Sequence, residues 1–308
     1  MRILVVGAGS TGGYFGACLA RHGRDVTFLV RGERAKKLRQ QGLVIHADSG
    51  TFTLQPNTLL ATEITTPYDL IIITVKSFAL PGAITDLRAA AGEHTLILPV
   101  LNGMQHIDTL RREFGDDKVI GGLCKIHAPL NDKGEVLQMS PLHQLCYGEL
   151  DGSNTSRIQQ LDQLLSGCGF DNRLSSSVQS DLWEKWLLLS TLGAVTCLSR
   201  GNTRQILTSA GGETLLNSIF SEGLAVITAS GYRQRPAIIA AILQTLSNPE
   251  TPMTSSMYRD LQQGALIEAE PIIGDLVDRA RQHAITVPLL NAVFVNLQVY
   301  LRSRQAES

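Results

Sequence analysis

The chain of 308 residues has little charge of either sign, and this scarcity removes a class of partners. Charged residues make up 18% of the sequence, both signs are interspersed, and the net charge is only −1. Proteins that bind nucleic acid or an anionic membrane surface by electrostatics need a basic stretch. We therefore expect no nucleic-acid partner and no membrane partner.

Cysteine is also scarce, and no two cysteines stand in a CxxC spacing. Disulfide frameworks and zinc sites need paired or closely spaced cysteines. We therefore expect a reducing compartment, no disulfide framework and no metal site. The five cysteines are Cys18, Cys124, Cys146, Cys168 and Cys197.

Long apolar runs are missing as well. The N-terminal run Ile3–Val6 is too short for the apolar core of a signal peptide. The mostly apolar stretch 186–198 covers 13 residues, whereas a membrane span needs about 20. We expect a soluble cytoplasmic protein.

What is present begins with the first sixteen residues. An apolar strand, Ile3–Val6, runs into a glycine-rich loop and then a helical pattern, Tyr14–His22. Strand, GxGxxG and helix in this order predict a dinucleotide-binding loop. One glycine permits the tight turn, one lets the backbone approach a pyrophosphate, and one packs the helix on the strand. A glycine-rich turn of another α/β protein is the alternative. The loop residues are Gly7, Ala8, Gly9, Ser10, Thr11 and Gly12.

Arg31 stands at the end of the second predicted strand, Asp25–Val30, nineteen residues after Gly12. NAD enzymes usually carry an acid here that binds the ribose 2′-hydroxyl, whereas an arginine accommodates a 2′-phosphate. Arg34, Lys36 and Lys37 add further positive charge. We therefore favour NADP(H) as the cofactor, the alternative being a solvated basic start of a helix.

Strands and helices then alternate, which predicts an α/β Rossmann-type, doubly wound parallel sheet over residues 1–176. Ligands bind at the carboxyl ends of the strands in such sheets. Lys76 and Asn102 each follow a buried strand and are therefore candidate site residues. The later strands are expected at 68–75, 95–101 and 118–123, and 135–139 and 144–148 are expected to extend the sheet in an antiparallel way.

Beyond Ser175-Ser176-Ser177 the pattern has no clear strand. We predict an all-helical second domain over residues 177–308. Its expected helices are 178–198, 203–230, 236–245, 256–265, 268–283 and 288–303.

Two places in this half could carry chemistry. Lys185 is a cation inside an apolar helix, and burial would lower its pKa toward a range useful for proton transfer. From periodicity alone, an exposed lysine on an amphipathic helix is the favoured interpretation. Ser255 and Ser256 precede a helical run, where serines usually serve as N-caps. Glu268 lies at the start of the next helix, where the helix dipole stabilises a carboxylate.

Taken together, these motifs resemble the ketopantoate reductase (2-dehydropantoate 2-reductase) family over nearly the full length. The resemblance implies NADPH-dependent reduction of 2-dehydropantoate to pantoate in pantothenate biosynthesis, with a parallel-sheet cofactor domain and an all-helical second domain. It rests on Gly7-x-Gly-x-x-Gly12, Arg31, Lys76, Asn102-Gly-Met, Leu182-Trp-x-Lys185, Ser255-Ser-Met-x-x-Asp260, Glu268 and Gly274.

The resemblance also implies roles. Lys185 resembles the family's general acid, which protonates the developing alkoxide and stabilises it. Glu268 resembles the carboxylate that anchors the substrate hydroxyl, and Ser256 a donor to the substrate carboxylate. Asn102 resembles the residue between nicotinamide and substrate. Lys76 resembles a cation on the cofactor side, and Arg31 the contact to the 2′-phosphate.

The sequence departs from the family on the helix that carries Lys185. Ketopantoate reductases have asparagines four and eight residues further on, on one helical face, where this chain has Leu189 and Gly193. Thr196 is the remaining polar candidate for contact with the substrate. Residues 270–273 are also more apolar than in the family. Sites that lose such hydrogen-bond partners lose discrimination for a hydroxyl.

Three functions stay open. The first is the NADPH-dependent reduction of 2-dehydropantoate. The second is the reduction of a different, less polar 2-oxo acid or ketone. The third, from another class, is an NADP-binding redox sensor without turnover. The joint presence of Lys185, Glu268, Ser256 and Asn102 argues against the third. Either enzyme would bind a small 2-keto acid, and a homodimer is a further possibility.

Overall fold

The computed structural model describes residues 1–306 and places β1 at the centre of a five-stranded parallel sheet in the order β5-β2-β1-β6-β7. Val6 pairs with Leu29 on one side and with Ile73 on the other, so three neighbouring strands end at the same edge. Ligands of such sheets bind at this edge. The strands are β1 (Arg2–Val6), β2 (Asp25–Leu29), β5 (Asn57–Leu59), β6 (Tyr68–Ile73) and β7 (Ala91–Pro99).

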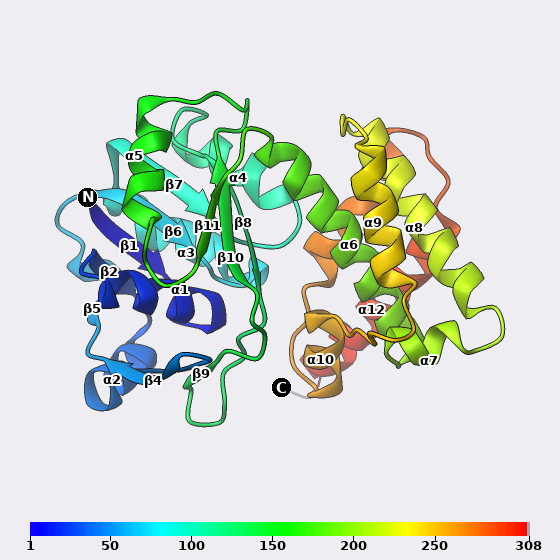
Figure 1. The fold of residues 1–308 in the computed structure, drawn as a ribbon, viewed down its shortest axis with the longest axis horizontal. Helices are drawn as coiled ribbons and strands as arrows, with labels where there is room; N and C mark the ends of the chain where they lie inside the picture. Colours follow the sequence, from blue (N-terminus) through cyan, green and yellow to red (C-terminus); the bar gives the residue numbers. More distant parts are fainter. Residues whose placement is uncertain (307–308) are drawn as a thin grey trace. The chain divides into compact units, whose positions relative to one another are not determined.

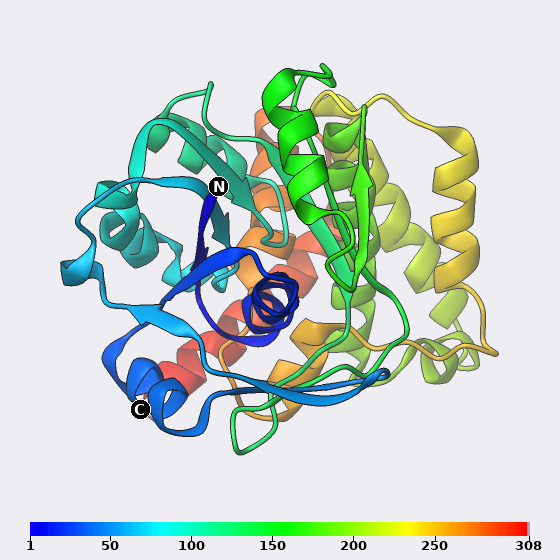
Figure 2. The ribbon, with the colours of Figure 1, turned by 60° about the vertical axis from the view of Figure 1, so that its left-hand side comes forward.

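The sheet is covered by helices on both faces because its strands are apolar on both faces. Ile3 and Val5 pack with α1, α2 and α5, whereas Leu4 and Val6 pack with α3 and α4. Alternate side chains of one strand therefore serve two cores, and the predicted doubly wound fold is confirmed (Figure 2). The helices are α1 (Ser10–Arg21), α2 (Gly32–Gln41), α3 (Leu80–Leu87), α4 (Gln105–Phe114) and α5 (Ser156–Leu165), with short turns η1 (Ala61–Glu63), η2 (Ser77–Ala79) and η3 (Arg88–Ala90).

Two small sheets differ from the expected extension of the main sheet. β8 joins β10 and β11, with the β8–β10 pair antiparallel as expected. The predicted strand over 135–139, however, is only the two-residue β9, and it pairs in parallel with β3, a strand that we did not predict. The strands are β3 (Leu43–Ala47), β4 (Gly50–Leu54), β8 (Gly121–Ile126), β9 (Val136–Leu137), β10 (His143–Gly148) and β11 (Asp171–Leu174).

The rest of the chain is helical, as predicted (Figure 1). The expected single helix over 203–230 is wrong, because Gly211 has a φ of 79° and separates α7 from α8. The helices are α6 (Val178–Ser199), α7 (Thr203–Leu207), α8 (Gly212–Ala229), α9 (Pro236–Leu246), α10 (Ser256–Gln262), α11 (Asp275–Gln282) and α12 (Pro288–Ala306). Within residues 1–306, none of the helices combines the length and the apolar character of a membrane span.

The contacts divide the chain into two units. The first comprises Met1–Leu101 and His106–Gln179, and the second comprises Asn102–Gln105 and Ser180–Ser308. The short segment Asn102–Gln105 thus groups with the helices although it follows a strand of the main sheet. Our domain boundary between residues 176 and 177 stays a prediction.

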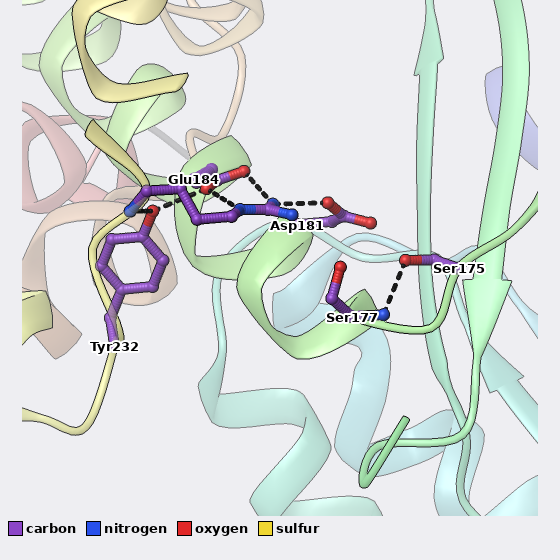
Figure 3. Close-up of polar contacts among 6 residues, drawn as sticks. Ser175, Ser177, Asp181, Glu184 and Tyr232 are labelled. Carbon is purple, nitrogen blue, oxygen red and sulfur yellow. Dashed lines mark hydrogen bonds and ion pairs between the residues drawn. The ribbon is translucent and has the colours of Figure 1, made fainter. Parts of the chain in front are cut away.

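Buried carboxylates anchor the helical unit. Arg235, in the segment before α9, donates to Asp181 and Glu184 on α6, and the Tyr232 hydroxyl donates to Glu184 at 2.6 Å (Figure 3). Glu222 on α8 accepts from the backbone N–H groups of Leu289 and Leu290 and so caps α12. The two acidic residues of α6, Asp181 and Glu184, are thereby paired with Arg235, and most of the remaining helix is apolar.

Candidate active site

The glycine-rich loop has the geometry of a dinucleotide cradle. Gly7 has a φ of 95°, which a residue with a side chain adopts only under strain. A Cβ at Gly12 would stand 2.1 Å from the Gly7 carbonyl oxygen and 2.2 Å from Thr74 Oγ1, so the helix can approach only with glycine there. A Cβ at Gly9 would meet nothing within 4 Å. The space beside Gly9 at the start of α1 is therefore open, as a bound pyrophosphate would require.

The side chains of Thr74, Ser10 and Arg34 hold the loop in place, and only Ser10 was predicted from the sequence as part of the site. Thr74 Oγ1 donates to the carbonyl oxygens of Val6 at 3.0 Å and Gly7 at 3.1 Å. Ser10 Oγ donates to the Ala128 carbonyl oxygen. The hydroxyl of Ser10 therefore joins the start of α1 to the segment that contains Ala128. The backbone of Ser10 and of half-buried Thr11 lies at the open start of the helix.

Arg34 holds the same loop from the side. Its Nε and Nη2 donate to the Ala8 carbonyl oxygen at 3.1 and 2.8 Å, and Nη2 also donates to the Gly134 carbonyl oxygen. Burial lowers the pKa of this guanidinium from its ordinary value, but an arginine remains charged at neutral pH. Arg34 therefore places a positive charge beside the loop. Its partners are remote in sequence, which is why the sequence did not reveal this role.

Arg31 and Lys76 are exposed at the strand ends. Arg31 precedes α2, and its guanidinium forms no hydrogen bond or ion pair within residues 1–306. Its Nη2 lies 3.3 Å from the point where a Cβ at Gly82 would stand, so it lies across the first turn of α3. Lys76 lies three residues after the end of β6 and immediately before η2. Both predicted cations thus lie at the ligand-binding edge of the sheet.

Lys185 lies on α6, with Leu189 and Gly193 four and eight residues further along the same face. It is half-buried, and in the described part of the chain its ammonium group has no hydrogen-bond or ion-pair partner. It is also the last lysine in the sequence. The neighbouring Glu184 is occupied by Arg235 (Figure 3). The ammonium group is therefore available to a ligand.

The start of α10 is bound to α6. Ser255 is the N-cap, accepting from the Tyr258 N–H at 2.9 Å, and its hydroxyl lies 2.9 Å from Thr196 Oγ1. Thr196 is fully buried and also donates to the Leu192 carbonyl oxygen. Thr196 therefore positions the start of α10, and its expected contact with the substrate stays a prediction. Ser256 is exposed and its hydroxyl has no hydrogen-bond partner within residues 1–306, so it can donate to a ligand.

Glu268 is buried and comes immediately before the helical turns that lead to α11. Residues Glu270–Gly274 form η4, a π-helical turn, a feature frequent at functional sites. Trp186 Nε1 donates to the Ile272 carbonyl oxygen at 3.0 Å, which joins this turn to α6 beside Lys185. Burial, followed by the charges of Asp278 and Asp275, raises the pKa of Glu270.

The segment Asn102–Gln105 contacts the same turn. A Cβ at Gly103 would stand 2.5 Å from the Pro271 carbonyl oxygen, and Gly103 has a φ of 87°. The adjacent Asn102 is half-buried, and its amide is unpaired within the described chain. Contacts in the helical unit therefore connect the segments that carry Lys185, Ser256, Glu268 and Asn102.

Comparison with known proteins decides the family. Residues 3–152 match the family model of ketopantoate reductase PanE/ApbA, and residues 177–300 match the model of its C-terminal part. The chain is 35% identical over 97% of its length to an uncharacterised oxidoreductase, YkpB, of Bacillus subtilis, covering 99% of that protein. This chain belongs to the ketopantoate reductase PanE/ApbA family.

Two further proteins extend the comparison. A 2-dehydropantoate 2-reductase of Halobacterium salinarum is 27% identical over 95% of this chain and 96% of its own length. The structure of a D-mandelate dehydrogenase with NADH and anilino(oxo)acetate has the same fold, with a TM-score of 0.89, 21% identity and coverage of 99% and 100% of the two chains. As a member of the ketopantoate reductase family, the chain is an oxidoreductase.

Proposed function

We propose that the chain is an NADPH-dependent reductase of 2-oxo acids, with 2-dehydropantoate as the first substrate to test. The observation that carries this proposal is the state of Lys185. Within residues 1–306 its ammonium group has no hydrogen-bond or ion-pair partner, and it lies on a largely apolar helix of a chain from the ketopantoate reductase family. Arginine cannot release a proton at neutral pH. Lys185 is the last lysine of the chain, and it is therefore the best placed general acid of the helical unit.

The cofactor would be held by the glycine-rich loop. The open space at Gly9 and the start of α1 fit the pyrophosphate, and the free guanidinium of Arg31 fits a 2′-phosphate. Lys76 would add positive charge at the strand ends. When bound, the reduced nicotinamide would supply the hydride for the reduction.

The remaining chemistry belongs to side chains of this protein. Lys185 would donate its proton to the carbonyl oxygen as negative charge develops there, and its charge would stabilise that oxygen. Ser256 would donate a hydrogen bond to the substrate carboxylate. Asn102 would orient the keto group with its unpaired amide. Glu268 would accept a hydrogen bond from a substrate hydroxyl, where the substrate has one.

A less polar 2-oxo acid is the second candidate, and Gly193 is the observation that favours it. The positions four and eight residues after Lys185 carry leucine and glycine, so this face offers no side-chain donor. A substrate whose far end is apolar would need no hydrogen bond from this face of α6.

The test is oxidation of NADPH by the purified chain with a panel of 2-oxo acids. Lys185→Ala should lower kcat on the order of 10²-fold while NADPH binding stays unchanged. Lys185→Arg should be equally slow, because it keeps the charge but cannot release the proton. Lys125→Ala, an exposed lysine on β8, is the control. Full activity of Lys185→Ala, or NADPH binding without turnover of any 2-oxo acid, would exclude the proposal.

A further inference from the structure

The only two tryptophans of the sequence, Trp183 and Trp186, stand on α6 just before and just after Lys185. Both are buried, with 5% and 1% of their surface exposed, and their ring centroids are 5.6 Å apart. Residues three apart on a helix lie on the same side of it. The two rings therefore form one aromatic surface on the helix that carries Lys185, and a segment that docks on them is fixed relative to that helix.

The segment that contains η4 and α11 docks on these rings at two places. Trp186 Nε1 donates to the Ile272 carbonyl oxygen at 3.0 Å, within η4. Arg279, on α11, lies over both rings, with its Cζ 5.3 Å from the Trp183 centroid and 5.7 Å from the Trp186 centroid. Asp275 accepts from Arg279 Nε at 3.1 Å and so holds the guanidinium in place. The π-helical turn and the helix that follows it are thus both attached to α6 through the tryptophan pair.

The bond between the indole and the carbonyl is the directional one of these two contacts. A cation is attracted anywhere over the face of an aromatic ring, within about 6 Å of its centroid, whereas an N–H···O bond weakens steeply when its angle changes. Trp186 and Ile272 are 1% and 3% exposed. Water therefore cannot replace the bond if the carbonyl moves, and a buried donor without a partner is unfavourable. The bond fixes the place of the Ile272 carbonyl oxygen on α6.

The turn η4 depends on contacts of this kind. It is wider than an α-turn, because the Asp275 N–H donates to the Glu270 carbonyl oxygen, five residues back instead of four. Such turns are rare, so contacts from outside the turn must favour it here. Glu268 is buried and lies four residues before Ile272. A shift of the turn would therefore move the Glu268 carboxylate as well.

We propose that Trp186 is a positioning residue of the active site: its indole N–H holds η4 on α6 and so places Glu268 relative to Lys185. This inference rests on the proposed function, in which Lys185 donates the proton and Glu268 binds the substrate. Trp186 is almost fully buried, so it acts through Glu268 rather than on the substrate. Trp183 belongs to the same ring pair, but its indole donates no hydrogen bond within residues 1–306, which makes it the matched control.

A double-mutant cycle with Glu268 tests this role, using the 2-oxo acid that the unaltered chain reduces fastest. Trp186→Phe should lower kcat/KM about tenfold or more and leave the dissociation constant of NADPH within about twofold. Glu268→Gln should lower kcat/KM as well, and the double variant should match Glu268→Gln alone within about twofold, because both changes act on the same carboxylate. Trp183→Phe removes the same volume, and its own effect should multiply with that of Glu268→Gln, as for independent sites.

A second replacement separates the hydrogen bond from the size of the ring. Benzothienylalanine in place of Trp186 keeps the shape of the indole but has sulfur instead of the N–H, so it should reproduce the loss of kcat/KM with a smaller fall in the thermal midpoint. The inference is overturned if this replacement leaves kcat/KM within about threefold of the unaltered chain, or if the loss in Trp186→Phe multiplies with that in Glu268→Gln. Full activity of Glu268→Gln would also overturn it, while Lys185→Ala would still test the general acid. Failure of the unaltered chain to reduce any 2-oxo acid would instead overturn the proposed function, and this inference with it.

Discussion

Arg235 binds Glu184 through two parallel donors: Nε donates to Oε1 at 2.6 Å, and Nη2 donates to Oε2. Nη2 also donates to Asp181 at 2.6 Å. Both carboxylates are about nine-tenths buried, whereas Arg235 is 35% exposed. The hydrogen bonds that the guanidinium donates to Glu184 raise the pKa of Arg235 further above its ordinary value. This arrangement anchors the segment before α9 to the helix that carries Lys185.

Removing this guanidinium should destabilise the protein. Arg235→Met leaves two buried carboxylates without their cation, and we expect a loss of about 2–3 kcal/mol after allowing for the exposure of the arginine. The midpoint of urea denaturation measures the effect. Arg233→Met, two residues earlier and exposed, serves as the control and should change stability by less than about 0.5 kcal/mol. Equal midpoints for the two variants would show that the ion pairs contribute nothing.

The glycines of the loop should respond differently to the same substitution. Gly9→Ala adds a methyl group to empty space, so the thermal midpoint should hold while NADPH binding weakens about tenfold or more, because the phosphate site is narrowed. Gly12→Ala forces a methyl group against Gly7 and Thr74, so both the thermal midpoint and binding should fall. Calorimetry of the free protein and titration with NADPH separate the two outcomes. Unchanged NADPH binding by Gly9→Ala would show that the pyrophosphate does not bind at this loop.

Arg31 and Arg34 should have distinct effects on cofactor choice. The guanidinium of Arg31 has no partner within residues 1–306. Arg31→Asp should therefore weaken the binding of NADPH much more than that of NADH, and change the ratio of their dissociation constants about 100-fold. Arg34→Met removes the hydrogen bonds to the Ala8 and Gly134 carbonyl oxygens and should weaken the binding of NADPH and NADH to the same extent. If Arg31→Asp weakened both equally, the assignment of NADP(H) would be wrong.

Acid should destabilise the first unit through Glu149. Burial alone would raise the pKa of this carboxyl, but hydrogen bonds from Arg157 and Thr155 outweigh burial and hold the pKa below its ordinary value of 4.5. A group with a lowered pKa stabilises the fold above its unfolded pKa, and this contribution is lost as the pH falls through the folded value. Stability should therefore decline below about pH 4.5.

The Glu149→Gln variant tests this origin. It should lose about 1–2 kcal/mol near pH 7 and show a flatter decline in acid, measured by urea denaturation across pH. Glu113→Gln removes a more exposed ion pair with Arg88 and should cost less than about 0.5 kcal/mol. An unchanged acid limb in Glu149→Gln would assign the decline to other carboxyl groups.

Local sequence patterns were sufficient where one segment determines the structure. The strand Ile3–Val6, the glycine-rich loop and the helical character of the chain after residue 177 are set by their own residues, and the structure confirms them. Strand β3 was missed because it is short and lies outside the main sheet, pairing instead with β4 and β9. The break at Gly211 was missed because apolar periodicity continues on both sides of it.

The candidate site was predictable only to the level of single residues. Arg34, Thr74 and Trp186 contact partners that lie far away in the sequence, so no local spacing could reveal them. Thr196 is the converse case: its position on α6 fits a ligand contact, which stays a prediction, but the sequence does not show that its hydroxyl bonds to Ser255 and Leu192. Tertiary packing decides which polar groups remain available.

The π-helical turn η4 has a consequence for the angular phase of the residues before it. A π-turn holds one residue more than an α-turn, and each residue of an α-helix advances by about 100°. Side chains that precede η4, Glu268 among them, are therefore rotated by roughly that angle from where an uninterrupted helix ending at Gln282 would present them. Deleting one residue within Glu270–Gly274 would restore a regular helix. The Glu268 carboxylate would then point in a different direction around the helix axis, although Glu268 itself is unchanged.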